Sequence, residues 1–156
     1  MTIVGEGPDD ELARALIVRL GLADRIEFVG MRPHADVIRR LTAASVFIHP
    51  SATAADGDSE GGAPTILLEA QAIGTPIVST RHADIPHIVH EGPGAVLCAE
   101  HDIGALADAL VATIRGRTPS SASVVIERHD VAHAITRLEE LYTLTAKGVG
   151  IVSSAS

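Results

Sequence analysis

Short runs of β-branched residues alternate along this chain with longer stretches that have helical periodicity. The expected strands are Thr2–Val4, Ile26–Val29, Val46–His49, Ile77–Ser79 and Ala95–Leu97. The expected helices are Asp9–Leu20, Ala35–Ala44, Pro64–Ile73, Ile103–Arg115 and Val131–Thr145, with a loop over Gly116–Ser123. Strands that are separated by helices usually pair in parallel, so this order predicts an α/β fold built on a parallel sheet.

The composition suits such a fold. The chain has 156 residues, of which 46% are apolar, but it contains only two Phe, one Tyr and no Trp. Aliphatic side chains must therefore fill the core, which is typical of helices packed on a buried parallel sheet. We expect one domain over residues 1–147 and a flexible tail over 148–156, where small and polar residues follow the last helix.

Charge and residue usage exclude several classes of protein. The net charge is −8, with 12 basic and 20 acidic residues, whereas a nucleic-acid footprint needs a basic patch. No apolar run approaches the length of about 20 residues that a membrane helix needs, and the start does not resemble a signal peptide. One cysteine, Cys98, rules out an internal disulfide and fits a reducing compartment. We therefore expect a cytoplasmic protein with no nucleic-acid partner and no membrane span.

A glycine-rich turn precedes the helix predicted over Pro64–Ile73. Proline suits the first position of a helix, and Gly74 suits the position just after its end. The backbone N–H groups of Gly62, Ala63 and Thr65 are expected to point out of the helix start, where they and the helix dipole attract anions. The glycines would let a ligand approach the backbone closely. This turn is the first candidate binding feature.

Glu69 lies within that apolar helix, and Glu60 lies just before the turn. Glu69 shares a helical face with Ile66 and Ile73, and we expect that face to pack on the sheet. A carboxylate buried there needs hydrogen-bond partners, and ligand hydroxyls or backbone donors could supply them. The alternative is a glutamate at the edge of the apolar stripe that reaches into water. The pattern of residues leaves both interpretations open.

Several sequence blocks follow one another in order over nearly the whole chain. They are IVGEGP at 3–8, LGLADRIEFVG at 20–30, LTAASVFIHPS at 41–51, EGGAPTILLEAQAIGTPIVST at 60–80, ADIPHIV at 83–89, ALADAL at 105–110 and RLEELY at 137–142. Together they resemble the C-terminal, nucleotide-sugar-binding domain of a retaining GT-B glycosyltransferase in the glycosyl transferases group 1 family. The resemblance implies a Rossmann-like parallel sheet with helices on both faces, and transfer of a hexose from a nucleotide-diphosphate sugar with retention of configuration.

The resemblance also implies roles for individual residues. Glu69 would hydrogen-bond the ribose hydroxyls, and Glu60, the expected catalytic residue, would contact the transferred sugar. The remaining substrate-binding residues would be Gly61, Gly62, Ala63, Pro64 and Thr65 at the sugar and diphosphate, and Gly30 and Met31 beside the base. The nucleotide sugar is the donor substrate, and no cofactor or metal is expected.

The resemblance implies that the chain is one part of such an enzyme. It would lack the first strand of the donor-binding domain, an Arg and a Lys that neutralise the diphosphate, and the N-terminal acceptor domain. We expect the isolated chain to be inactive unless another domain or chain completes it. The alternative is a non-catalytic nucleotide-sugar-binding module or a degenerate fragment.

Two other clusters contain residue types that can bind metals. His82, Asp84, His87 and His90, with His101 nearby, fit no standard zinc spacing, and Asp56-Gly57-Asp58 lacks the later ligands of a calcium loop. We interpret these residues as loop side chains and expect no metal at either place. Cys98 is interpreted as a small packed residue.

Overall fold

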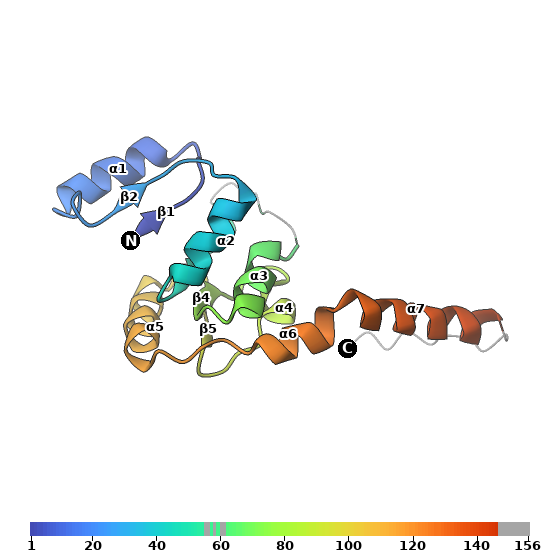
Figure 1. The fold of residues 1–156 in the computed structure, drawn as a ribbon. Coiled ribbons are helices and arrows are strands. Elements are labelled where there is room, and N and C mark those ends of the chain that lie inside the picture. The colour runs from blue at the N-terminus through green and yellow to red at the C-terminus, as the bar shows by residue number, and fades with distance from the viewer. Residues whose placement is uncertain (55–56, 58, 60–61, 147–156) are drawn as a thin grey trace. The chain divides into compact units, whose positions relative to one another are not determined.

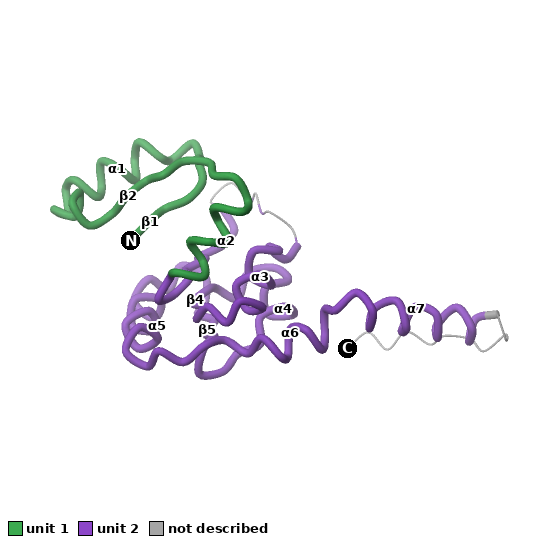
Figure 2. Tube along the Cα trace, in the orientation of Figure 1, with its two compact units in different colours: residues 1–43 green, residues 44–156 purple. Residues whose placement is uncertain are grey.

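The computed structural model describes residues 1–54, 57, 59 and 62–146 (Figure 1). The chain divides into two compact units, Met1–Ala43 and Ala44–Ser156 (Figure 2). Among the described residues, no helix combines the length and apolar character that crossing a membrane requires. The predicted bounds of a domain over 1–147 with a tail over 148–156 stay a prediction, because residues 147–156 lie outside the described part.

The first unit is a small βαβ arrangement followed by a helix. Its elements are β1 (Thr2–Ile3), α1 (Asp10–Arg19), β2 (Glu27–Phe28) and α2 (His34–Ala43). β1 and β2 pair in parallel, with Ile3 opposite Phe28. α1 connects the two strands, which is the crossover that parallel pairing requires.

The second unit contains a three-stranded parallel sheet. Its elements are β3 (Phe47–His49), α3 (Thr65–Ile73), β4 (Ile77–Thr80), α4 (Ile85–Ile88), β5 (Ala95–Cys98), α5 (Ile103–Gly116), α6 (Ala122–His129) and α7 (Val131–Ala146). The strand order is β3-β4-β5, and Ser79 pairs with His49 on one side and Leu97 on the other. Every residue of the central strand β4 is buried.

Helices cover this sheet on both sides. α5 packs on β4 and β5, while α3 packs on β4 and on α6, and Figure 1 shows α5 and α3 on either side of the strands. Leu67 of α3, Ile77 of β4 and Ile85 of α4 are fully buried and form the centre of the core. The predicted parallel α/β arrangement is therefore confirmed.

The predicted strands are all present, and the five predicted helices are present with ends shifted by a residue or two. Two helices were missed. The region predicted as a loop over Gly116–Ser123 already contains the start of α6, and α4 lies where a Pro interrupts the pattern. Val124, Val125 and Ile126 are β-branched and have low helix propensity, so α6 depends on the burial of Val125 rather than on local preference.

The ends of α3 follow the turn chemistry of the sequence. Gly74 caps the helix with φ +85°, and its N–H bonds to the carbonyl of Gln71 at 2.9 Å. Pro64 was predicted as the first helical residue, and this is wrong by one position. Its ψ of 117° is extended, so Pro64 is the residue before the helix and Thr65 begins it.

A close backbone approach between Gly94 and Pro119 holds the start of β5 against the segment after α5. A Cβ atom built on Gly94 would lie 2.1 Å from the carbonyl oxygen of Pro119, a distance that no side chain can occupy. The same construction on Gly92, two residues earlier, meets nothing within 4 Å. Gly94 is thus required for packing, whereas Gly92 has open space around it.

Gly94→Ala is expected to lower the free energy of unfolding by about 1–3 kcal/mol or more, because the new methyl group forces two backbone segments apart. Gly92→Ala is the matched control and should change it by no more than about 0.5 kcal/mol. Urea denaturation followed by circular dichroism measures both. Equal losses in the two variants would contradict the close approach.

Candidate functional site

The carboxyl ends of β3, β4 and β5 meet at one edge of the sheet, because the three strands are parallel. Polar residues follow each strand directly. Ser51 and Thr53 come after β3, His82 comes after β4, and Glu100 comes after β5. Open parallel sheets bind their ligands outside this edge, so these residues outline the candidate site.

His82 and Glu100 form the centre of this polar edge. The ring of His82 is 5% exposed, and its Nδ1 lies 2.9 Å from Oε1 of Glu100. Its Nε2 lies 3.2 Å from the hydroxyl oxygen of Ser59. The second carboxylate oxygen of Glu100 accepts a hydrogen bond from the backbone N–H of Thr53 at 2.9 Å. One carboxylate and one imidazole therefore connect the segments that follow all three strands.

These contacts change the acidity of Glu100. The backbone N–H of Thr53 is the main cause that lowers the pKa of this carboxyl, and the hydrogen bond with His82 adds to it. Both donors stabilise the ionised form. Glu100 is thus held as a carboxylate in the folded protein.

Side-chain hydroxyl groups fasten β3 to β4 at the same edge. Ser79 donates to the carbonyl of His49 at 2.6 Å, and Thr80 donates to the carbonyl of Ser51. The hydroxyl of Ser51 lies 3.0 Å from Nδ1 of His49. The chain leaving β3 is therefore fixed before it continues toward α3.

A shallow pocket opens beside these residues. Its volume is ≈170 Å³, and it is lined by Pro50, Ser51, Ala52, Thr80, Ala99, His101, Asp102, Ile103 and Leu106. Pockets that enclose a drug-sized ligand usually measure about 300–1,000 Å³. This pocket alone is too small for a large ligand, which would have to lie along the open edge.

The glycine turn leads into α3 within the same unit. Gly62 has φ +103°, which a residue with a side chain rarely adopts. Ala63, Pro64 and Glu69 are half-buried, and Thr65 is exposed. Glu60 and Gly61 lie outside the described residues. Gly62–Pro64 thus lead into α3, which begins at Thr65, and Glu69 lies in the middle of that helix.

The predicted orientation of α3 is wrong in one respect. Leu67, Ala70 and Gln71 form its buried face, whereas Ile66 is half-buried and Ile73 is 36% exposed. Glu69 therefore lies at the edge of the buried face, not on it. This face of α3 can include Gln71 because its amide nitrogen and its amide oxygen both have hydrogen-bond partners inside the protein.

Gln71 is 1% exposed and joins α3 to α4. Its amide nitrogen donates to the carbonyls of Leu67 at 3.1 Å and Ile88 at 2.9 Å, and its amide oxygen accepts from the N–H of His90 at 3.0 Å. A buried amide with three such hydrogen bonds helps to fix the position of the helix that carries it. Glu69 is consequently carried on a rigid element.

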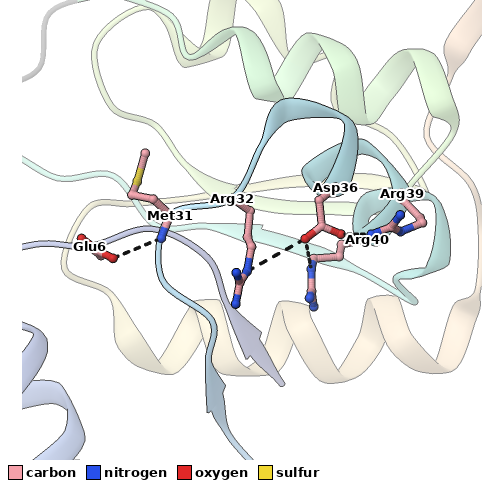
Figure 3. A network of polar contacts seen from close by, with 6 residues as sticks. All are labelled: Glu6, Met31, Arg32, Asp36, Arg39 and Arg40. Carbon is pink, nitrogen blue, oxygen red and sulfur yellow. Dashed lines mark hydrogen bonds and ion pairs between the residues drawn. The ribbon is translucent and has the colours of Figure 1, made fainter.

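Gly30 and Met31, predicted beside a base, lie in the first unit. Gly30 has φ +67°, and Oε1 of Glu6 is only 2.8 Å from the place where a Cβ atom on Gly30 would sit. The same oxygen accepts from the N–H of Met31 at 3.3 Å, as Figure 3 shows. Met31 is 68% exposed. Sequence analysis missed Glu6, although its place between Gly5 and Gly7 allowed this close approach.

The basic side chains near these loops have acidic partners. Figure 3 shows Arg32, Arg39 and Arg40 around the carboxylate of Asp36, with Arg40 Nε at 3.3 Å and Arg32 Nε at 4.0 Å. Partial burial alone would raise the pKa of Asp36, but the hydrogen bonds and charges of Arg40 and Arg39 lower it.

In the second unit, Arg81 contacts both carboxylate oxygens of Glu91 at 2.7 Å. An anion binding beside Arg81 would therefore compete with a carboxylate.

The histidine cluster considered above as a metal site lies within the described residues. Within the described residues, no three His, Cys, Asp or Glu side chains converge as metal ligands. Asp56 and Asp58 lie outside those residues. Cys98 is buried in β5, and burial raises the pKa of its thiol, which favours the protonated form of a packed residue.

Comparison with known proteins finds a protein family whose model matches this chain. The family model described as glycosyl transferases group 1 matches residues 1–115. WcaL of Escherichia coli strain K12, a glycosyltransferase that its name assigns provisionally to colanic acid biosynthesis, is 42% identical over 79% of this chain and 30% of its own length. The amylovoran biosynthesis glycosyltransferase AmsK of Erwinia amylovora is 36% identical over 83% of this chain and 32% of its own length. This chain thus spans about a third of these relatives.

Solved structures share the fold. Anabaena HepE, crystallised in complex with UDP, matches 91% of this chain and 40% of its own with a TM-score of 0.64 and 22% identity. The lipopolysaccharide outer core galactosyltransferase WaaB, in its apo form, matches the same shares with a TM-score of 0.68 and 21% identity. These likenesses show a Rossmann-like α/β fold of the GT-B type, as the sequence predicts.

The ionised Glu100 leads to a prediction about acid stability. Its pKa is lower in the folded chain than the ordinary value of 4.5, so its contribution to stability is present above that pH and is lost as the pH falls through the lower, folded value. Glu100→Gln should lower the melting temperature at pH 7, and its difference from wild type should shrink below about pH 4.5. Thermal melts from pH 7 to pH 3 measure this, with Glu140→Gln on α7 as a matched loss of one exposed charge. A constant difference for Glu100→Gln over the whole range would contradict the stabilised carboxylate.

Proposed function

Because this chain belongs to the glycosyl transferases group 1 family, we propose that it binds a nucleotide-diphosphate sugar at the carboxyl edge of β3, β4 and β5. It then serves as the donor-binding half of a glycosyltransferase that transfers a hexose with retention of configuration. The observation that carries this proposal is the half-buried residue Glu69 on α3, a helix that follows a turn in which Gly62 has φ +103°. UDP in the complex of the similar protein HepE supports the choice of ligand.

The chemistry of the turn and of α3 suits such a donor. A carboxylate accepts hydrogen bonds through both of its oxygens, so Glu69 can bind the two adjacent hydroxyls of a ribose. The start of α3 offers N–H groups and the positive end of the helix dipole to a diphosphate. Gly62 lets the diphosphate approach the backbone closely. Ala63, Pro64 and Thr65 complete this binding segment. Gly30 and Met31 are assigned to the base by resemblance alone.

Glu60 is assigned to the transferred sugar and to catalysis by resemblance alone, since it lies outside the described residues. The protein would accelerate transfer mainly by holding the donor and by stabilising the charge that develops on the leaving diphosphate. The acceptor would come from an N-terminal domain or from another chain. No metal or other cofactor enters this proposal, and a cytoplasmic location is part of it.

A second candidate is a module that binds a nucleotide sugar without transferring it. This chain spans 30% of WcaL and 32% of AmsK, so the activity of those whole proteins is not carried over to it. Incubation with a labelled nucleotide sugar separates the two candidates. Release of the sugar to water or to a supplied acceptor supports the enzyme, and binding without release supports the module.

Calorimetric titration of the full chain with UDP, UDP-sugars and GDP-mannose tests the proposed site. Wild type is expected to give saturable heat with one nucleotide class. Glu69→Ala should weaken that binding about 10- to 100-fold, because two hydrogen bonds to a charged acceptor are lost.

The control for this titration is Glu140→Ala, which removes an exposed carboxylate on α7 and should bind as wild type does. Glu69→Gln, which keeps the size but not the charge, should lie between wild type and Glu69→Ala. Unchanged affinity in Glu69→Ala, or no heat from a folded wild-type chain, would contradict the proposal.

A further inference from the structure

His82 is a buried imidazole in which both ring nitrogens have a polar neighbour. Nδ1 faces the carboxylate of Glu100 at 2.9 Å, and Nε2 faces the hydroxyl group of Ser59 at 3.2 Å. A carboxylate only accepts, so Nδ1 must carry a proton and donate it to Glu100. In the neutral ring Nε2 is then an acceptor, and it receives the hydrogen bond of the Ser59 hydroxyl. Glu100 thereby fixes the ring tautomer in which His82 presents an acceptor nitrogen, Nε2, to Ser59.

Glu100 also bonds to Thr53, which lies earlier in the segment that links β3 to α3. Its Oε2 accepts from the backbone N–H of Thr53 at 2.9 Å, while its Oε1 is bound to His82. Thr53 and Ser59 both belong to the connection between β3 and α3. The residues after β4 and β5 therefore hold this connection at two points, and nothing in the mechanism of donor binding described above uses them.

We infer that His82 and Glu100 form a positioning pair that holds Thr53 and Ser59, two residues of the β3–α3 connection, for the sugar end of the donor site. This inference rests on the proposed function. Ser59 directly precedes Glu60, which that function assigns to the transferred sugar. Glu69, assigned to the ribose, is held separately, by Leu67 and Ala70 in the core and by the hydrogen bonds of Gln71.

Because Ser59 and Glu69 are held by different contacts, disrupting the His82–Glu100 pair should affect sugar binding and nucleotide binding differently. Loosening the connection should weaken recognition of the sugar while leaving recognition of the nucleotide largely intact. A connection that reaches its binding arrangement in about one tenth of the molecules weakens sugar binding about tenfold. A general loss of stability would instead weaken both equally.

Two substitutions at His82 each keep one of its two contacts and remove the other. Asn places its amide near the position of Nδ1, so His82→Asn keeps the contact with Glu100 and loses the one with Ser59. Gln reaches toward the position of Nε2, so His82→Gln keeps the contact with Ser59. Glu100→Ala removes the anchor of Thr53, and His129→Gln, at an exposed histidine of α6, is the control.

The measured quantity is the ratio of the Kd for the best-bound nucleotide sugar to the Kd for its free nucleotide diphosphate, on full-length chains. The ratio should rise about tenfold in His82→Asn and in Glu100→Ala. It should stay within about twofold of wild type in His82→Gln and His129→Gln. His82→Gln keeps the contact with Ser59, and His82→Asn loses it. If His82 contributed only to overall stability, the two variants would not differ in this ratio.

Amide hydrogen exchange in the ligand-free chains accompanies the titration. Exchange at Thr53 should accelerate in Glu100→Ala, while exchange at Val78 in the central strand stays as in wild type. If wild type binds and the ratio is unchanged in all variants, or exchange at Thr53 is unaltered, the pair does not position the connection, and the proposed function stands. If a folded wild-type chain binds no nucleotide, the proposed function fails and the inference fails with it.

Discussion

Parallel pairing of β3, β4 and β5 is the constraint on which the second unit depends. It sends three chain segments out at one edge, and β4 is buried along its whole length, so their polar groups must be satisfied locally. Ser79 and Thr80 bond back to the chain leaving β3, and the buried imidazole of His82 bonds to Glu100. The need to satisfy these polar groups locally therefore stabilises this edge and also fixes the positions of its polar side chains.

Two kinds of anchoring meet at this edge. α3 is positioned by the core, through Leu67 and the buried, hydrogen-bonded amide of Gln71, which makes Glu69 a side chain on a rigid support. Thr53 and Ser59, which lie in the connection before α3, are held by the side chains of Glu100 and His82. A donor molecule that bound here would have its nucleotide on the rigid part and its sugar beside the side-chain-held part.

Local sequence rules predict much of the fold. Alternating β-branched and helical segments fix the order of strands and helices, and Gly74 and Pro64 mark the ends of α3 within one residue. α6 was missed because its β-branched residues favour a strand locally and become helical only through burial of Val125. The face of α3 was also misjudged, since a buried Gln71 becomes acceptable only once its partners on α4 are known.

The candidate site was predictable in part. The turn and Glu69 are predicted from motif and resemblance and stay a prediction, whereas the contact between His82 and Glu100 depends on two loops that are distant in sequence. Their position directly after neighbouring strands was the available signal. The central claim is that the donor lies along this edge with its ribose on Glu69. A crystal structure of the chain with a bound nucleotide sugar tests it most directly. The account predicts both ribose hydroxyls within hydrogen-bonding distance of the Glu69 carboxylate, and a nucleotide bound elsewhere would contradict it.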